Sequence, residues 1–175
     1  MRQTVYYGII GLGILWGAVL LVRWLWFGDR LAPPSVLADR ILNAPSAEEK
    51  ISAAHDMVRH GPVARAEMDR VLATFRTDDP AVAVAVFDAA AAAKCWRSLP
   101  KLFDWMEHPD ARIRGKAGSA VSVIMGADYF FRASDPPEKR AETLARIKMV
   151  YQRLQPELEA IFERGAAAGA EGASR

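Results

Sequence analysis

Three histidines and a single cysteine are the residues of this 175-residue chain best suited to metal or nucleophilic chemistry. His55 and His60 lie five positions apart, on different faces of a helix, whereas a helical metal site needs its ligands on one face. His108 precedes Pro109 and is expected to cap a turn. The sequence therefore predicts neither a metal site nor a cofactor site.

Cys95 is the one candidate nucleophile. A catalytic thiol needs a nearby base or cation that stabilises its thiolate, and Lys94 and Arg97 are the nearest cations in sequence. Because a run of alanines precedes this segment and Trp96 follows Cys95, a buried small residue is the favoured interpretation. The sequence has no glycine-rich phosphate loop after a strand and no Gly-x-Ser-x-Gly elbow, so we expect no enzyme activity.

The densest aromatic cluster outside the N-terminal segment is Asp128-Tyr129-Phe130-Phe131-Arg132. It falls between expected helices, where binding residues often lie. One interpretation is an interaction surface that contains Tyr129, Phe130 and Arg132. The favoured interpretation is a wedge that closes the last groove of a helical body, with Asp128 as a cap and Arg132 in an ion pair.

Residues 4–22 contain no charged side chain. About 20 apolar residues in a helix span a bilayer, and a single span must satisfy its own backbone hydrogen bonds. A cleaved signal peptide would end in small residues, whereas Arg-Trp-Leu-Trp-Phe comes after this run. Aromatic residues suited to the two membrane interfaces flank it: Tyr6, Tyr7, Trp24 and Trp26. We therefore predict a single-pass transmembrane anchor over residues 1–28, with the lipid bilayer as its partner.

Positive charge is spread thinly along the rest of the chain. The formal net charge is +2, and without Arg2 and Arg23 the chain has 21 basic and 21 acidic residues. Nucleic-acid binding needs concentrated positive charge, so it is not expected. Arg23, Arg30 and Arg40 come after the span, against Arg2 before it, which favours a cytoplasmic location for the helical domain.

Gly13 and Gly17 form a Gly-x-x-x-Gly pair within the predicted span. This spacing lets two membrane helices approach closely, which would permit a homodimer through the span. The alternative is that glycine is simply frequent in such helices.

After residue 33 the patterns of helices recur and those of strands do not. A linker and a short helix are expected over 29–45, a helical domain over 46–164 and a disordered Ala/Gly-rich tail over 165–175. Proline, serine and aspartate place the expected helices at about 34–43, 46–60, 62–75, 80–94, 98–106, 110–125 and from 137 onward. Their apolar faces include Met68, Val71, Leu72 and Phe75, and later Leu144, Ile147, Tyr151 and Leu154.

Three of these helices look like copies of one unit. Ile51, Val84 and Ile113 each come about five residues after a turn and are 33 and 29 positions apart. Small residues come after each of them, which lets neighbouring helices approach closely. A period near 30 of this kind predicts a short α-solenoid of antiparallel helix pairs.

The segment His108-Pro-Asp-Ala-Arg-Ile-Arg-Gly-Lys-Ala-Gly-Ser-Ala-Val-Ser-Val-Ile-Met-Gly126 resembles a HEAT repeat of the short, bilin-lyase-like kind. Its features are a Pro/Asp turn, the pair Ile113-Arg114, alanines and a final glycine. The resemblance covers roughly 46–155, although the earlier copies depart from it: Ala85 replaces the arginine in one, and no proline precedes Ile51 in the other. It implies an all-α, HEAT-like repeat domain.

Such a domain, attached to a membrane anchor, is expected to be a scaffold or protein–protein interaction module with an unidentified protein partner. Polar residues beside a turn are the candidate contacts: Arg112, Arg114 and Lys116. One alternative is a structural subunit of a larger membrane complex that packs through Gly13 and Gly17. Another, implied by the resemblance, is a chromophore-handling lyase-like protein that uses Cys95, His108 and Asp128.

Overall fold

The computed structural model describes residues 31–173. The chain divides into two units, Met1–Ala32 and Pro33–Arg175, and the described structure belongs almost wholly to the second. The predicted anchor over 1–28, including Gly13 and Gly17, lies outside the described residues. Within 31–173, every helix is too short or too polar to cross a membrane.

The described residues are all-α, as predicted. Helices pair across short turns: α2 (Pro34–Asn43) with α3 (Ala47–His60), α4 (Arg65–Thr74) with α5 (Pro80–Ala92), and α6 (Leu99–Trp105) with α7 (Ala111–Met125). The 3-10 turns η1 (Gly61–Ala64) and η2 (Trp96–Ser98) connect one pair to the next. The long helix α8 (Pro137–Ala173) comes after the last pair.

A side-chain oxygen caps the second helix of each pair. Ser46 Oγ accepts the N–H of Glu49 at 3.2 Å, Asp79 Oδ1 that of Ala81 at 2.8 Å, and Asp110 Oδ1 that of Arg112 at 2.7 Å. These bonds satisfy backbone donors that the first helical turn leaves without partners.

The positions of these caps show that the third predicted repeat, which contains Ile113, was aligned incorrectly with the other two. Ile51 and Val84 lie five residues after their caps, whereas Ile113 lies three residues after Asp110. Accordingly Ile113 is fully buried, while Ile51 and Val84 are half-buried. The predicted equivalence of Ile113 with the other two is therefore wrong by two residues.

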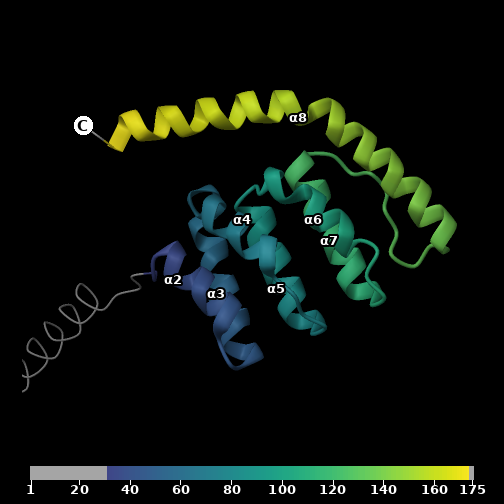
Figure 1. Ribbon diagram of the computed structural model, residues 1–175, viewed down its shortest axis with the longest axis horizontal. Helices are drawn as coiled ribbons and strands as arrows, with labels where there is room; N and C mark the ends of the chain where they lie inside the picture. The colour runs from purple at the N-terminus through teal and green to yellow at the C-terminus, as the bar shows by residue number, and fades with distance from the viewer. Residues whose placement is uncertain (1–30, 174–175) are drawn as a thin grey trace, which may run out of the picture. The chain divides into compact units, whose positions relative to one another are not determined.

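The second helices of the pairs form one layer, in which α5 packs between α3 and α7 (Figure 1). The shorter α2 packs on α3 and α4, and α6 packs on α7. Small residues fill the faces of the first layer where helices meet. These buried positions include Ala53, Ala54, Ala83, Ala89, Ala90, Ala117 and Gly118. Because such residues let backbones approach closely, the alanine-rich helices become the centre of the core.

The predicted apolar stripes are confirmed for both α4 and α8. Met68, Val71, Leu72 and Phe75 are buried, as are Leu144, Ile147 and Tyr151, while Leu154 is half-buried. The ring of Tyr151 packs edge-on against Phe103, with 5.6 Å between ring centroids. These contacts hold the first turns of α8 against the helix pairs.

Helix α8 is longer than the sequence predicted. It continues through Pro156 to Ala173, whereas a disordered tail was expected from residue 165. Alanine has the highest helix propensity of all residues, so the Ala-rich stretch extends the helix despite its glycines.

Candidate functional site

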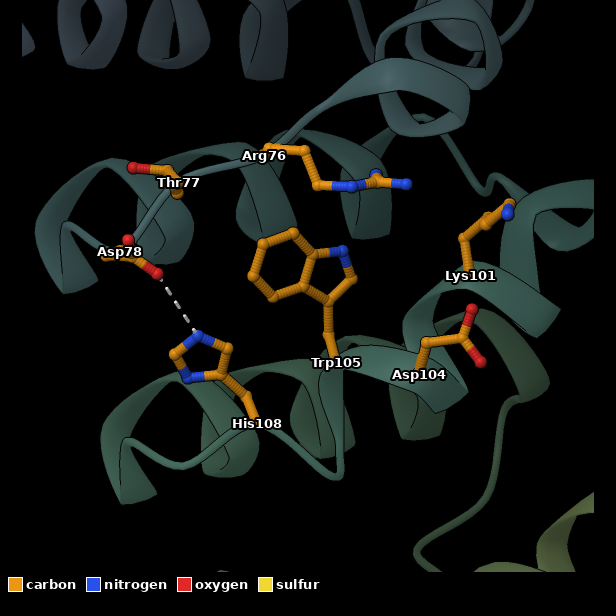
Figure 2. A pocket seen from close by; sticks show the side chains of 7 residues that line it. All are labelled: Arg76, Thr77, Asp78, Lys101, Asp104, Trp105 and His108. Atoms are coloured by element: carbon orange, nitrogen blue, oxygen red, sulfur yellow. Dashed lines mark ion pairs between the residues drawn. The ribbon is translucent and has the colours of Figure 1, made fainter.

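A hollow of about 470 Å³ opens between the turns of two consecutive helix pairs. Its walls come from the 75–79 turn between α4 and α5, from α6, and from the 106–110 turn before α7. The lining residues are Arg76, Thr77, Asp78, Lys101, Asp104, Trp105 and His108 (Figure 2). We call this site the Trp105 hollow.

Trp105 forms the floor and is 9% exposed. Its ring packs against Phe87 edge-on at 5.5 Å and against Phe75 at 5.8 Å, both measured between ring centroids. His108 stacks on it at 5.5 Å. Three elements therefore hold the indole in one orientation, so the floor of the hollow is preformed.

His108 closes one end of the hollow. Its Nδ1 accepts the backbone N–H of Asp110 at 3.1 Å, which is the turn-capping role predicted for this residue. Its Nε2 lies 3.8 Å from Asp78 Oδ1. Asp78 and His108 are thus directed at each other across this end (Figure 2).

Hydrogen-bond donors gather at the opposite end. The guanidinium of Arg76, the indole N–H of Trp105 and the side chain of Lys101 surround the same space, with Asp104 beside Lys101 (Figure 2). Arg76 is partly fixed, because one of its terminal nitrogens donates to the carbonyl of Phe75 at 2.6 Å. In the described part of the chain, no cluster of three or more His, Cys, Asp and Glu side chains is arranged to hold a metal ion.

The sequence pointed to none of the residues at this donor end. Arg76 lies in a turn and Lys101 and Trp105 lie on another helix, 25 and 29 positions further along the chain, so no spacing pattern links them. A tryptophan among charged residues on a short helix was the one available signal, and by itself it equally fits a core position.

The three predicted contacts on α7 mostly serve the fold. Lys116 Nζ lies 2.6 Å from Asp88 Oδ1 on α5, and Arg112 pairs with Asp110 at 3.1 Å. Arg114 donates to the carbonyls of His108 and Pro109, each at 2.7 Å, and to that of Ala133 at 2.8 Å. Arg112 keeps 74% of its side chain exposed and is the most accessible of the three.

Tyr129, Phe130 and Arg132 lie in the segment between α7 and α8. Tyr129 is half-buried, while Phe130 is 72% exposed and has a φ of 55°. A second hollow, of about 390 Å³, lies here. It is lined by Phe130, Arg132, Asp135, Lys139, Glu142, Thr143 and Arg146. The structure thus brings Phe130 and Arg132 together at a concave surface, which the α7 contacts do not line.

Cys95 is fully buried. Its Sγ donates to the carbonyl of Arg65 at 3.9 Å. Burial raises the pKa of the Cys95 thiol far above its ordinary value, and the nearby Asp69 carboxylate raises it further. Asp69 in turn accepts a 2.5 Å hydrogen bond from Ser98 Oγ. The thiol is therefore protonated and inaccessible, which is unfavourable for a nucleophile.

Asp128 also has a local role, because its Oδ1 accepts the backbone N–H of Phe130 at 2.8 Å. This is the capping role that the wedge interpretation assigned to it. Comparison with known proteins assigns no role to any of these residues. No family model matches this chain, and neither a curated protein nor a solved structure matches it.

Proposed function

We propose that this protein is a membrane-tethered helical-repeat module, a short HEAT-like α-solenoid that binds a protein partner and has no catalytic activity. Three stacked helix pairs with small-residue inner helices support the solenoid assignment. The uncharged run at 4–22 supports the tether, and the few residues between it and Pro34 would keep the repeats close to the membrane.

The Trp105 hollow is the observation that carries the binding proposal. Residues that dominate binding energy at protein interfaces are enriched in tryptophan and arginine and sit inside a rim that excludes water. Here a fixed indole lies within a ring of charged side chains contributed by two consecutive helix pairs. A partner that entered the hollow would therefore contact the junction between repeats, which is where solenoids vary without disturbing their core.

Site-specific crosslinking tests the proposal. A photo-crosslinking amino acid in place of Asp104, an exposed residue that lines the hollow, should capture a discrete partner in native membranes. The same group at position 63 is the control, because Val63 is 81% exposed but lies in η1, outside the lining of the hollow. Equal capture at both positions, or none at position 104, would argue against the hollow as a binding site.

The tether has a separate test. The full chain should remain in the membrane pellet after extraction with alkaline carbonate, and removal of residues 1–28 should release it. Release of the intact chain would remove the membrane part of the proposal and leave the crosslinking result unaffected.

A structural subunit that packs through Gly13 and Gly17 is the second candidate. It is supported by the Gly-x-x-x-Gly spacing and predicts that replacing both glycines with leucine disrupts assembly. Assembly of such a subunit would not depend on the residues of the Trp105 hollow, whereas partner binding by the interaction module would. The burial of Cys95 disfavours the lyase-like alternative, because that alternative relied on an accessible thiol.

A further inference from the structure

We infer that the partner presents an acidic segment, and that one of its Asp or Glu carboxylates docks at the donor end of the Trp105 hollow. This inference rests on the proposed function and specifies the chemistry of the partner. It depends on which groups at the two ends of the hollow are already engaged and which remain directed into it.

The donor end offers three kinds of N–H to one space. Arg76 supplies a guanidinium, Lys101 an ammonium and Trp105 an indole N–H that points into the hollow (Figure 2). A carboxylate has two oxygens that accept several hydrogen bonds, and bonds from charged donors are the stronger ones. The indole can only donate, so its partner must be an acceptor.

Two carboxylates of the chain itself limit what the hollow can accept. Asp78 faces His108 at the opposite end, so it does not occupy the donor end. Asp104 lies beside Lys101 and offsets part of the positive charge (Figure 2). At the donor end, Arg76 and Lys101 together exceed Asp104 by one positive charge. This excess suits one singly charged carboxylate better than a phosphate group, which carries nearly two negative charges.

The other end of the hollow favours a peptide over a small anion. Asp78 is fully exposed apart from its approach to His108, and Thr77 lies next to it. Thr77 Oγ1 already accepts the backbone N–H of Asp79 at 3.1 Å. The Asp78 carboxylate can accept backbone N–H groups from an extended segment whose carboxylate lies at the donor end. The Trp105 floor between the two ends would contact the aliphatic part of that segment.

A fluorescently labelled peptide, Gly-Ser-Glu-Glu-Glu-Glu-Ser-Gly, tests the inference by anisotropy with the full chain in neutral phosphatidylcholine nanodiscs. The matched peptide has glutamine in place of glutamate. We expect the glutamate peptide to bind about tenfold or more tightly than the glutamine peptide, and to weaken as salt rises.

Variants locate the binding. Arg76→Gln and Lys101→Gln should each weaken the glutamate peptide by about tenfold, as expected for loss of a charge-assisted hydrogen bond. Arg132→Gln is the matched control, because it removes the same charge from an exposed residue in the second hollow. Melting curves of all three variants check that the fold is retained.

Equal binding of the two peptides would overturn the inference, as would an effect of Arg132→Gln as large as that of Arg76→Gln. If a partner is crosslinked at position 104 and its capture survives Arg76→Gln, the proposed function stands and the acidic segment is excluded. Failure to capture any partner would remove the proposed function itself.

Discussion

Phe131 lies so close to Gly118 that a Cβ added to the glycine would be 2.7 Å from Cδ1 of the ring. Gly118 is on the buried face of α7, and Phe131 belongs to the segment that leads to α8. Because Gly118 has no side chain, the Phe131 ring can pack directly against the backbone of α7. Arg114 anchors the same segment two residues later, through the carbonyl of Ala133.

Gly118→Ala should destabilise the protein by about 1–3 kcal/mol, the usual cost of overpacking a filled site. Gly115→Ala is the matched control on the same helix. Its added Cβ would meet Ala133 Cβ at an ordinary 3.4 Å, so the higher helix propensity of alanine should stabilise by up to about 1 kcal/mol. Denaturant unfolding of the full chain in detergent measures both. A Gly118→Ala variant as stable as the parent would contradict the close packing.

Arg114→Lys should cost about 2 kcal/mol or more, even though the charge is kept. The guanidinium reaches three carbonyls on two segments, from His108, Pro109 and Ala133, and a single ammonium cannot reproduce that fork. Arg112→Lys is the control, since that side chain is 74% exposed and pairs with its neighbour Asp110. Similar melting temperatures for the two variants would count against a bridging role for Arg114.

Phe130 should prefer glycine over alanine as a replacement. Its φ of 55° is unfavourable for residues with a Cβ, and the side chain is 72% exposed, so either replacement loses little burial. Phe130→Gly should be about 1 kcal/mol more stable than Phe130→Ala, the reverse of the order in a helix. Thermal melts followed by circular dichroism test this, and an alanine variant of equal or greater stability would refute it.

Asp69 and Asp110 should affect the pH dependence of stability with opposite signs. Burial raises the pKa of Asp69 above 3.8, despite the hydrogen bond from Ser98. The folded state then holds that proton more tightly than the unfolded state. Stability from this group is complete below 3.8 and is lost as pH rises through the folded pKa. In the Asp69→Asn variant, the free energy of unfolding should therefore fall less steeply as the pH rises above 3.8.

The side chain of Arg112 and backbone N–H groups of α7 lower the pKa of Asp110 below 3.8. Stability from this carboxylate is present above 3.8 and is lost as pH falls through the lowered pKa. Asp110→Asn should flatten the acid side of the profile. Free energies of unfolding measured from about pH 2.5 to 7 separate the two effects, and profiles that shift in the same direction would contradict them.

Cys95 should resist thiol reagents in the folded protein. The side chain is fully buried and its pKa is raised by burial, so iodoacetamide at about pH 8 should label it at the rate of unfolding. Because it is the chain's only cysteine, mass spectrometry of the whole protein reports it directly. Full labelling within minutes under native conditions would show that the site opens.

Much of the helical architecture was predictable because its causes are local. Ser46 accepts an N–H only three residues away, and the prolines at 34 and 80 each occupy a first helical turn. The stripe from Met68 to Phe75 is likewise contained within about two helical turns. Interactions over so few residues depend little on the rest of the chain, so residue types and spacing suffice to predict them.

Tertiary structure decided what lies far apart in sequence. Arg76 meets Trp105 and Lys101 only because the turns of two helix pairs stack, and Phe131 meets Gly118 only because the chain folds back over α7. The same folding turned Arg114, a predicted surface contact, into a bridge between segments. The sequence determined where the helices begin and which faces are apolar, since hydrogen bonds and periodicity act over a few residues. Packing between helices determined the hollow, because it depends on how whole helices meet rather than on any local pattern.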